Sequence, residues 1–112
     1  MKAATKKTNR KNQPTRSIPD LVEECHSVAR TKGWWDAPRN DAELIALMHS
    51  ELSEALEAMR NHGATDDIAE ELADCCIRIF DYCGARSIDL ETALLKKIEY
   101  NKTRPYRHGK KF

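Results

Sequence analysis

The sequence predicts an all-α protein, an antiparallel bundle of four main helices. Apolar residues recur at helical spacing in four separate stretches. The 112 residues include only four glycines and four prolines, as expected for long helices joined by short loops. No stretch shows the apolar and polar alternation of a half-buried strand. At this length, one domain is expected.

The first helix is predicted over residues 19–32. Ser17 or Asp20 can cap its start, because a short oxygen-bearing side chain accepts a hydrogen bond from a free backbone N–H. Gly33 suits its C-terminal end. The next residues, GWWDAPRN, are expected to form a loop that holds both tryptophans.

Residues 1–16 are expected to form a flexible basic tail, since they contain almost no large apolar side chains. The folded domain is therefore predicted to span residues 17–112. A solvated arm is favoured for the tail over a contact with nucleic acid.

The second helix is predicted to begin near Asn40 or Asp41. It ends in a short turn that contains His62 and Gly63. Because this turn is short, the second and third helices should pack antiparallel.

The third helix is predicted from Thr65 or Asp66 to Gly84. Apolar residues occupy most of its circumference, which predicts a central helix covered on several faces, including by another subunit. A fourth helix should follow the capping residue Asp89 and fade by Thr103. The basic segment after it is predicted to be coil.

The charge pattern is an acidic centre between basic ends, with an overall net charge of +1. The sequence holds no apolar run long enough to span a membrane and no apolar core of a signal peptide, so a cytoplasmic location is expected. The four cysteines lack zinc-ligand spacing. Cys75, Cys76 and Cys83 fall among apolar positions and are expected to be small core residues with reduced thiols; the fourth is Cys25.

Two acidic pairs are the main functional signal. In the second helix, Glu51 falls within the apolar arc and Glu54 lies at its edge, although a buried unpaired carboxylate is costly. In the third helix, Glu71 borders the apolar arc and Asp74 lies one step further round. The pairs 54/71 and 51/74 are both centred between residues 62 and 63. In an antiparallel hairpin the four carboxylates should therefore face one another at matched heights.

Four close carboxylates cannot all stay ionised without a counter-charge. Oxygen-only ligands favour Mg²⁺, with Mn²⁺ as the alternative, over zinc. A di-iron bundle would need Glu-x-x-His, and no histidine stands at that position. The alternative is an ordinary charged helix surface.

The segments ELSEALEAMR and EELADCC resemble motifs of the MazG-like nucleoside triphosphate pyrophosphohydrolases, of the all-α NTP pyrophosphatase superfamily. The tail KKIEYNKTRPYRHGKKF is similar to the third motif block of small members. The resemblance covers residues 18–112. It implies cleavage of a (d)NTP between the α and β phosphates to a monophosphate and pyrophosphate, in a helical dimer or dimer of dimers.

Carried over by position, the resemblance makes the two acidic pairs the Mg²⁺ ligands: Glu51, Glu54, Glu71 and Asp74. One of these glutamates, or the neighbouring Glu70, would position or deprotonate the attacking water. Lys97 and Asn101 match the Lys-x-x-x-Asn of the third block and would contact phosphate or sugar. Arg104 would join them.

Three further residues are candidate substrate contacts. Arg78 lies four residues after Asp74, where a salt bridge within the acidic cluster and a phosphate contact are both open. One of Trp34 and Trp35 is expected to pack on the core, and the other could stack on a nucleobase.

The expected partners are a nucleoside triphosphate and further copies of the chain, without a membrane and without nucleic acid as the main ligand. Two rival hypotheses remain. One is a non-enzymatic helical interaction protein, or a nucleic-acid-binding protein with a basic tail. The other is a metal-binding regulator that keeps the bundle without the activity.

Overall fold

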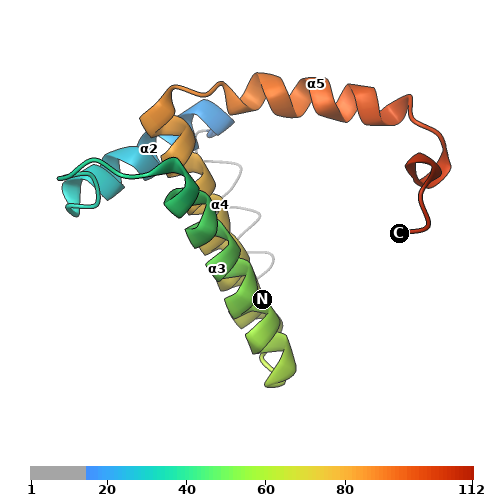
Figure 1. The fold of residues 1–112 in the computed structure, drawn as a ribbon, viewed down its shortest axis with the longest axis horizontal. Coiled ribbons are helices and arrows are strands. Elements are labelled where there is room, and N and C mark those ends of the chain that lie inside the picture. The colour runs from blue at the N-terminus through green and yellow to red at the C-terminus, as the bar shows by residue number, and fades with distance from the viewer. Residues whose placement is uncertain (1–14) are drawn as a thin grey trace.

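The structure is a computed structural model that describes residues 15–112. The predicted basic tail lies almost entirely outside the described residues. The elements are α2 (Ile18–Thr31), α3 (Asp41–Arg60), α4 (Thr65–Arg86), α5 (Leu90–Lys102) and the short 3-10 helix η1 (Tyr106–Gly109) (Figure 1). Residues 15–112 contain no strand, so the predicted all-α class with four main helices is confirmed. None of the helices in this range is long and apolar enough to cross a membrane.

The helix starts follow the capping residues in the sequence. The side chains of Ser17, Asn40 and Asp89 each accept a hydrogen bond from the backbone N–H three residues on, at 3.2, 3.1 and 3.0 Å. Each bond satisfies a donor that the helix leaves free at its first turn. The predicted starts of α2, α3 and α5 are therefore confirmed.

The turn between α3 and α4 makes these helices an antiparallel hairpin. His62 adopts a left-handed conformation with φ 59°. The Gly63 N–H then donates to the Ala58 carbonyl oxygen over 2.6 Å. A Cβ atom on Gly63 would lie 2.7 Å from that oxygen, so the turn needs glycine here.

The predicted end of the third helix at Gly84 is wrong, because α4 continues to Arg86. Its C-cap is Ser87, in the left-handed conformation with φ 55°. Gly84 instead marks a close crossing of α2 and α4. A Cβ atom there would lie 2.6 Å from the Cβ of His26, so the missing side chain lets the two helices approach.

Helix α4 is central, as predicted, and packs against both α3 and α2. Helix α5 does not lie alongside these three helices. It projects away from the C-terminal end of α4 and contacts mainly α2 (Figure 1). Its apolar side chains Leu94, Leu95 and Ile98 are consequently exposed. In one chain, three helices pack together and the fourth extends outward.

The core of the single chain is thin. The buried apolar side chains within residues 15–112 are Leu44, Ala55, Cys75 and Cys83. Burial raises the pKa of the Cys75 and Cys83 thiols, which keeps them protonated. The prediction that Cys76 is a core residue is wrong, because its side chain is exposed.

Candidate functional site

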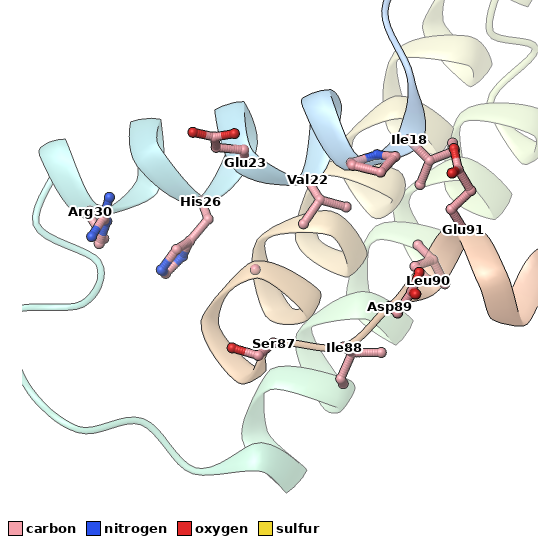
Figure 2. A pocket seen from close by; sticks show the side chains of 12 residues that line it. Ile18, Val22, Glu23, His26, Arg30, Ser87, Ile88, Asp89, Leu90 and Glu91 are labelled. Carbon is pink, nitrogen blue, oxygen red and sulfur yellow. The ribbon is translucent and has the colours of Figure 1, made fainter.

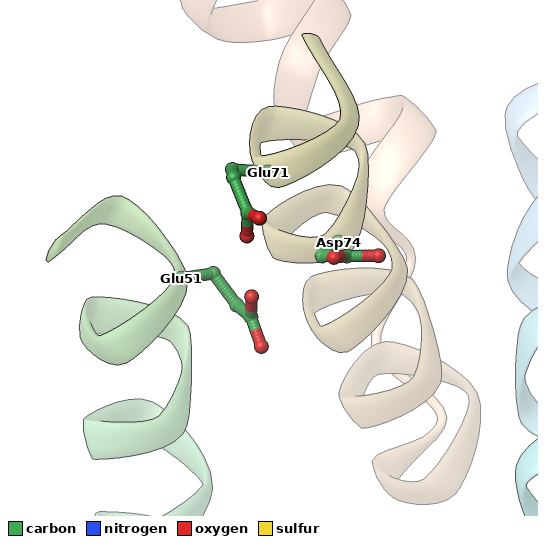
Figure 3. A group of neighbouring side chains, drawn as sticks. All are labelled: Glu51, Glu71 and Asp74. Carbon is green, nitrogen blue, oxygen red and sulfur yellow. The ribbon is translucent and has the colours of Figure 1, made fainter. Parts of the chain in front are cut away.

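The hairpin of α3 and α4 brings three of the four predicted acids together. Carboxylate oxygens of Glu51, Glu71 and Asp74 lie within 4.8 Å of one another. Figure 3 shows Glu51 reaching from α3 toward Glu71 on α4, with Asp74 one turn along. The turn position predicted that Glu51 of α3 would meet the acids of α4, and the carboxylate groups do lie close together. We call these three residues the acidic cluster.

Glu51 is the buried member of the acidic cluster, with 7% of its surface exposed. Its Oε1 accepts a hydrogen bond from the Nε of Arg78 over 2.8 Å. This ion pair offsets the cost of burying the carboxylate. It confirms the salt bridge that was one of the two predicted roles of Arg78.

The neighbours of Glu71 favour its protonated form. A hydrogen bond with the Glu54 side chain, burial, and the charges of Glu54, Asp74 and Glu51 raise the pKa of Glu71 to about 7. Its Oε2 is shielded from solvent and has no hydrogen-bond partner. An unpaired oxygen aimed into a cluster of acids is an expected coordination position for a cation.

The other predicted acids lie around this cluster. Glu54 is exposed and falls outside the group of three, but its carboxyl group reaches Glu71. Glu70 is exposed on α4 and belongs to neither the cluster nor the cavity beside it. The structure therefore favours Glu54 over Glu70 as the acid nearest the cluster.

A cavity of about 520 Å³ opens beside the acidic cluster. Glu51, Asp74 and Arg78 line its acidic end, and Trp34 and Arg39 line another part of its wall. The cavity is thus lined by carboxylates, by arginine side chains and by an aromatic ring. Such a combination of convergent polar groups and apolar surface is typical of a small-molecule site.

The two tryptophans differ in their surroundings. Trp35 is half-buried, and its Nε1–H donates to the Asp81 carboxylate at 2.9 and 3.2 Å. Trp34 is 61% exposed and lines the cavity. The Arg39 guanidinium lies 5.8 Å from the Trp34 ring centre and 5.3 Å from that of Trp35. Trp35 therefore packs on the protein, and Trp34 offers the accessible ring.

Asp81 is a residue that the sequence reasoning missed. It lies on α4, is only 9% exposed, and lines the cavity. Its Oδ1 lies 2.8 Å from Nδ1 of His26. An acid inside the apolar run CIRIFDYC was the available signal, since a buried carboxylate needs hydrogen-bond partners.

The three predicted contacts on α5 are not brought to the acidic cluster within one chain. None of Lys97, Asn101 and Arg104 lines the cavity beside it. Lys97 and Arg104 instead lie near the ring of Tyr100, at 4.9 and 5.5 Å from its centre. Their predicted roles remain predictions.

A second cavity of about 460 Å³ lies between α2, the end of α4 and the start of α5. Figure 2 shows Val22 and His26 of α2 across from Ser87 and Ile88. His26 borders this cavity while its ring bonds to Asp81, which borders the first one.

Comparison of the chain with models of protein families, with curated proteins and with solved structures finds no match.

Proposed function

We propose that this protein is a metal-dependent nucleoside triphosphate pyrophosphohydrolase of the MazG-like kind. The observation that carries the proposal is the acidic cluster at one end of a cavity whose wall also holds an arginine and an exposed tryptophan. Binding of a metal-bound triphosphate requires carboxylates for the cation, a positively charged side chain for the phosphates and a flat aromatic ring for the nucleobase. All three are present in one cavity.

The cluster suits Mg²⁺, with Mn²⁺ as the alternative. Its donors are carboxylate oxygens, which hard divalent cations prefer. Two of these residues, Glu51 and Asp74, line the cavity from which a phosphate would approach. The unpaired Oε2 of Glu71 supports the same assignment. A bound Mg²⁺ offsets the phosphate charges and lowers the pKa of a coordinated water.

The chain's own residues then have separate tasks. Glu51, Glu71 and Asp74 hold the cation. Glu54, at the edge of the cluster, is the group that we expect to accept a proton from the attacking water. Arg78 lines the cavity and is placed to turn from Glu51 toward a phosphate when a cation takes over the charge of Glu51. Hydrolysis between the α and β phosphates then yields a monophosphate and pyrophosphate.

We further propose that copies of the chain associate and that α5 serves the site of another copy. Leu94, Leu95 and Ile98 are exposed on α5, and Leu52 and Leu56 are exposed on α3. Pairing of these surfaces would bury apolar area that one chain leaves in water. It would also bring Lys97, Asn101 and Arg104 to an acidic cluster.

The test is product analysis with the purified chain, Mg²⁺ and a panel of canonical and modified NTPs and dNTPs. We expect a monophosphate and pyrophosphate, and loss of turnover with EDTA. Glu51→Gln should abolish turnover and weaken Mg²⁺ binding. The melting temperature without metal should change little, because a Gln amide oxygen can still accept from Arg78.

Glu57→Gln is the matched control, since Glu57 is an exposed acid on the same helix. It should leave turnover and metal binding unchanged. Absence of turnover on every nucleotide, with a folded protein and either Mg²⁺ or Mn²⁺, would refute the enzyme proposal and favour a helical binding protein.

A further inference from the structure

One buried carboxylate, that of Asp81, takes no part in the proposed hydrolysis. Asp81 lies on α4 in the cavity wall, and two side chains hold its carboxylate: Trp35, through Nε1–H, and His26, through Nδ1. Both short contacts are to Oδ1, at 2.9 and 2.8 Å. Oδ2 receives only the longer contact from Trp35, at 3.2 Å. The carboxylate therefore keeps acceptor capacity on a side chain that borders the cavity.

The position of Asp81 along α4 relates it to the acidic cluster. Asp74, Arg78 and Asp81 are spaced by four and three residues, which places them on one face of the helix. All three line the same cavity. Asp74 and Asp81 are about 10.5 Å apart along the helix axis, since each residue rises 1.5 Å. This separation is comparable to the length of one nucleoside.

The side chains from Asp74 to Asp81 follow the order of the parts of a nucleotide, with the phosphates at Asp74 and the base at Asp81. Asp74 belongs to the acidic cluster, which is the proposed place of the phosphates. Arg78 follows one turn later. Beyond Arg78 the cavity is also lined by Asp81, by the exposed ring of Trp34 and by Arg39, whose guanidinium faces that ring. A base stacked on that wall would present its polar edge to the carboxylate.

We propose that Asp81 reads the base and selects nucleotides whose base carries an amino group. A carboxylate offers acceptors only, so it pairs with the amino and ring N–H donors of guanine and with the amino groups of adenine and cytosine. Uracil and thymine place a carbonyl oxygen on each side of their single N–H donor. Those oxygens would face the carboxylate oxygens, which disfavours both bases.

The inference rests on the proposed function and is tested by binding rather than turnover. The probes are non-hydrolysable dNTP analogues with the α–β bridge replaced, added to the full chain with Mg²⁺ in a calorimeter. For the unmodified protein we expect the dGTP, dATP and dCTP analogues to bind about tenfold more tightly than the dTTP analogue. The dGTP analogue should also bind more tightly than the dITP analogue, which lacks only the amino group.

Asp81→Asn is the decisive variant. An Asn oxygen still accepts from Trp35 and His26, while its amide N–H₂ can donate to a carbonyl oxygen of a base. The preference over the dTTP analogue should shrink to less than twofold. Trp35→Phe is the matched control, because it removes a hydrogen bond to Asp81 and keeps the carboxylate. It should weaken binding without changing the order of the bases.

The outcomes separate the two proposals. An unmodified protein that binds all analogues equally would overturn the role of Asp81 and leave the enzyme proposal standing. Equal weakening of every analogue by Asp81→Asn would show a purely structural role and also overturn it. If no analogue binds to the folded protein with Mg²⁺, the proposed function fails and the inference fails with it. The comparison of dGTP and dITP analogues uses the unmodified protein, so it decides even if Asp81→Asn does not fold.

Discussion

Glu71 and Glu54 approach closely enough to share a hydrogen bond, so one of them must carry a proton at acidic pH. The pKa of Glu71 rises from 4.5 to about 7 chiefly for this reason. A carboxyl whose pKa is higher in the folded state binds a proton on folding. It therefore stabilises the metal-free fold at low pH. This contribution is lost as the pH rises from about 4.5 through about 7.

Metal binding should consequently depend on pH. The ligand form of Glu71 is ionised, so below pH 7 a bound cation must displace its proton. We expect the apparent Mg²⁺ affinity at pH 6 to be about tenfold lower than at pH 8, where the group is ionised already. Calorimetry in two buffers of different ionisation enthalpy should detect release of one proton at pH 6. Binding that is constant between these pH values would contradict this role of Glu71.

At the scale of single residues, the sequence carries the acidic cluster but not Asp81. Glu51, Glu71 and Asp74 are predictable because they belong to the pairs 51/74 and 54/71, whose members lie at matched distances in sequence from the hairpin turn between α3 and α4. The partners of Asp81 are 55 and 46 residues away in the chain, at His26 and Trp35. Which of these residues meet depends on how α2 and its following loop cross α4. Spacing within one helix does not contain that information.

At the scale of elements, the crossing of α2 and α4 depends on Gly84. Ala is the better helix former by about 1 kcal/mol. However, its Cβ would lie 2.6 Å from the Cβ of His26 and 3.3 Å from the Val22 carbonyl oxygen. Relieving such overlap costs about 1–3 kcal/mol. Because the helix-propensity gain offsets part of this cost, we expect Gly84→Ala to lower the free energy of unfolding by about 1 kcal/mol, measured by urea titration.

The control for this substitution is Ser53→Ala, at an exposed position within α3. It should change the free energy of unfolding by no more than about 0.5 kcal/mol. A Gly84→Ala variant as stable as the original protein would mean that α2 can shift away from α4 without loss.

The same position shows where local sequence rules stop. Glycine is common just past helix ends, and the sequence therefore predicts that the third helix ends at Gly84. The structure uses it for close helix packing, and the left-handed cap falls on Ser87. The starts of the helices were predictable because Ser17, Asn40 and Asp89 act on backbone groups three residues away. The direction of α5 was not, because packing between helices decides it.

The projection of α5 allows a complementation experiment. A Glu51→Gln copy lacks a cluster ligand, and a Lys97→Ala copy lacks a proposed phosphate contact. If α5 serves the site of another copy, a mixed dimer contains one intact site. Refolding an equal mixture should restore up to about a quarter of the original turnover, since half of the dimers are mixed and each has one intact site of two. Either variant refolded alone should stay inactive, and an inactive mixture would place Lys97 in its own chain's site or outside any site.

At the scale of the whole molecule, the thin core bears on stability. Only Leu44, Ala55, Cys75 and Cys83 are buried apolar side chains in the described chain, while many large apolar ones are exposed. We expect the melting temperature to rise with protein concentration, because association stabilises the folded state by mass action. Calorimetric scans and sedimentation across a hundredfold dilution check this together. A constant melting temperature and a monomeric species at every concentration would refute the assembly proposal.

The projection of α5 away from its own chain would make activity depend steeply on the concentration of the protein. If the site needs α5 from a second copy, an isolated chain is inactive however well its acidic cluster is formed. Below the concentration at which copies pair, activity then grows with the square of the amount of chain rather than in proportion to it. A twofold change in expression would thus change the output about fourfold, which makes the level of this protein a control on its own activity.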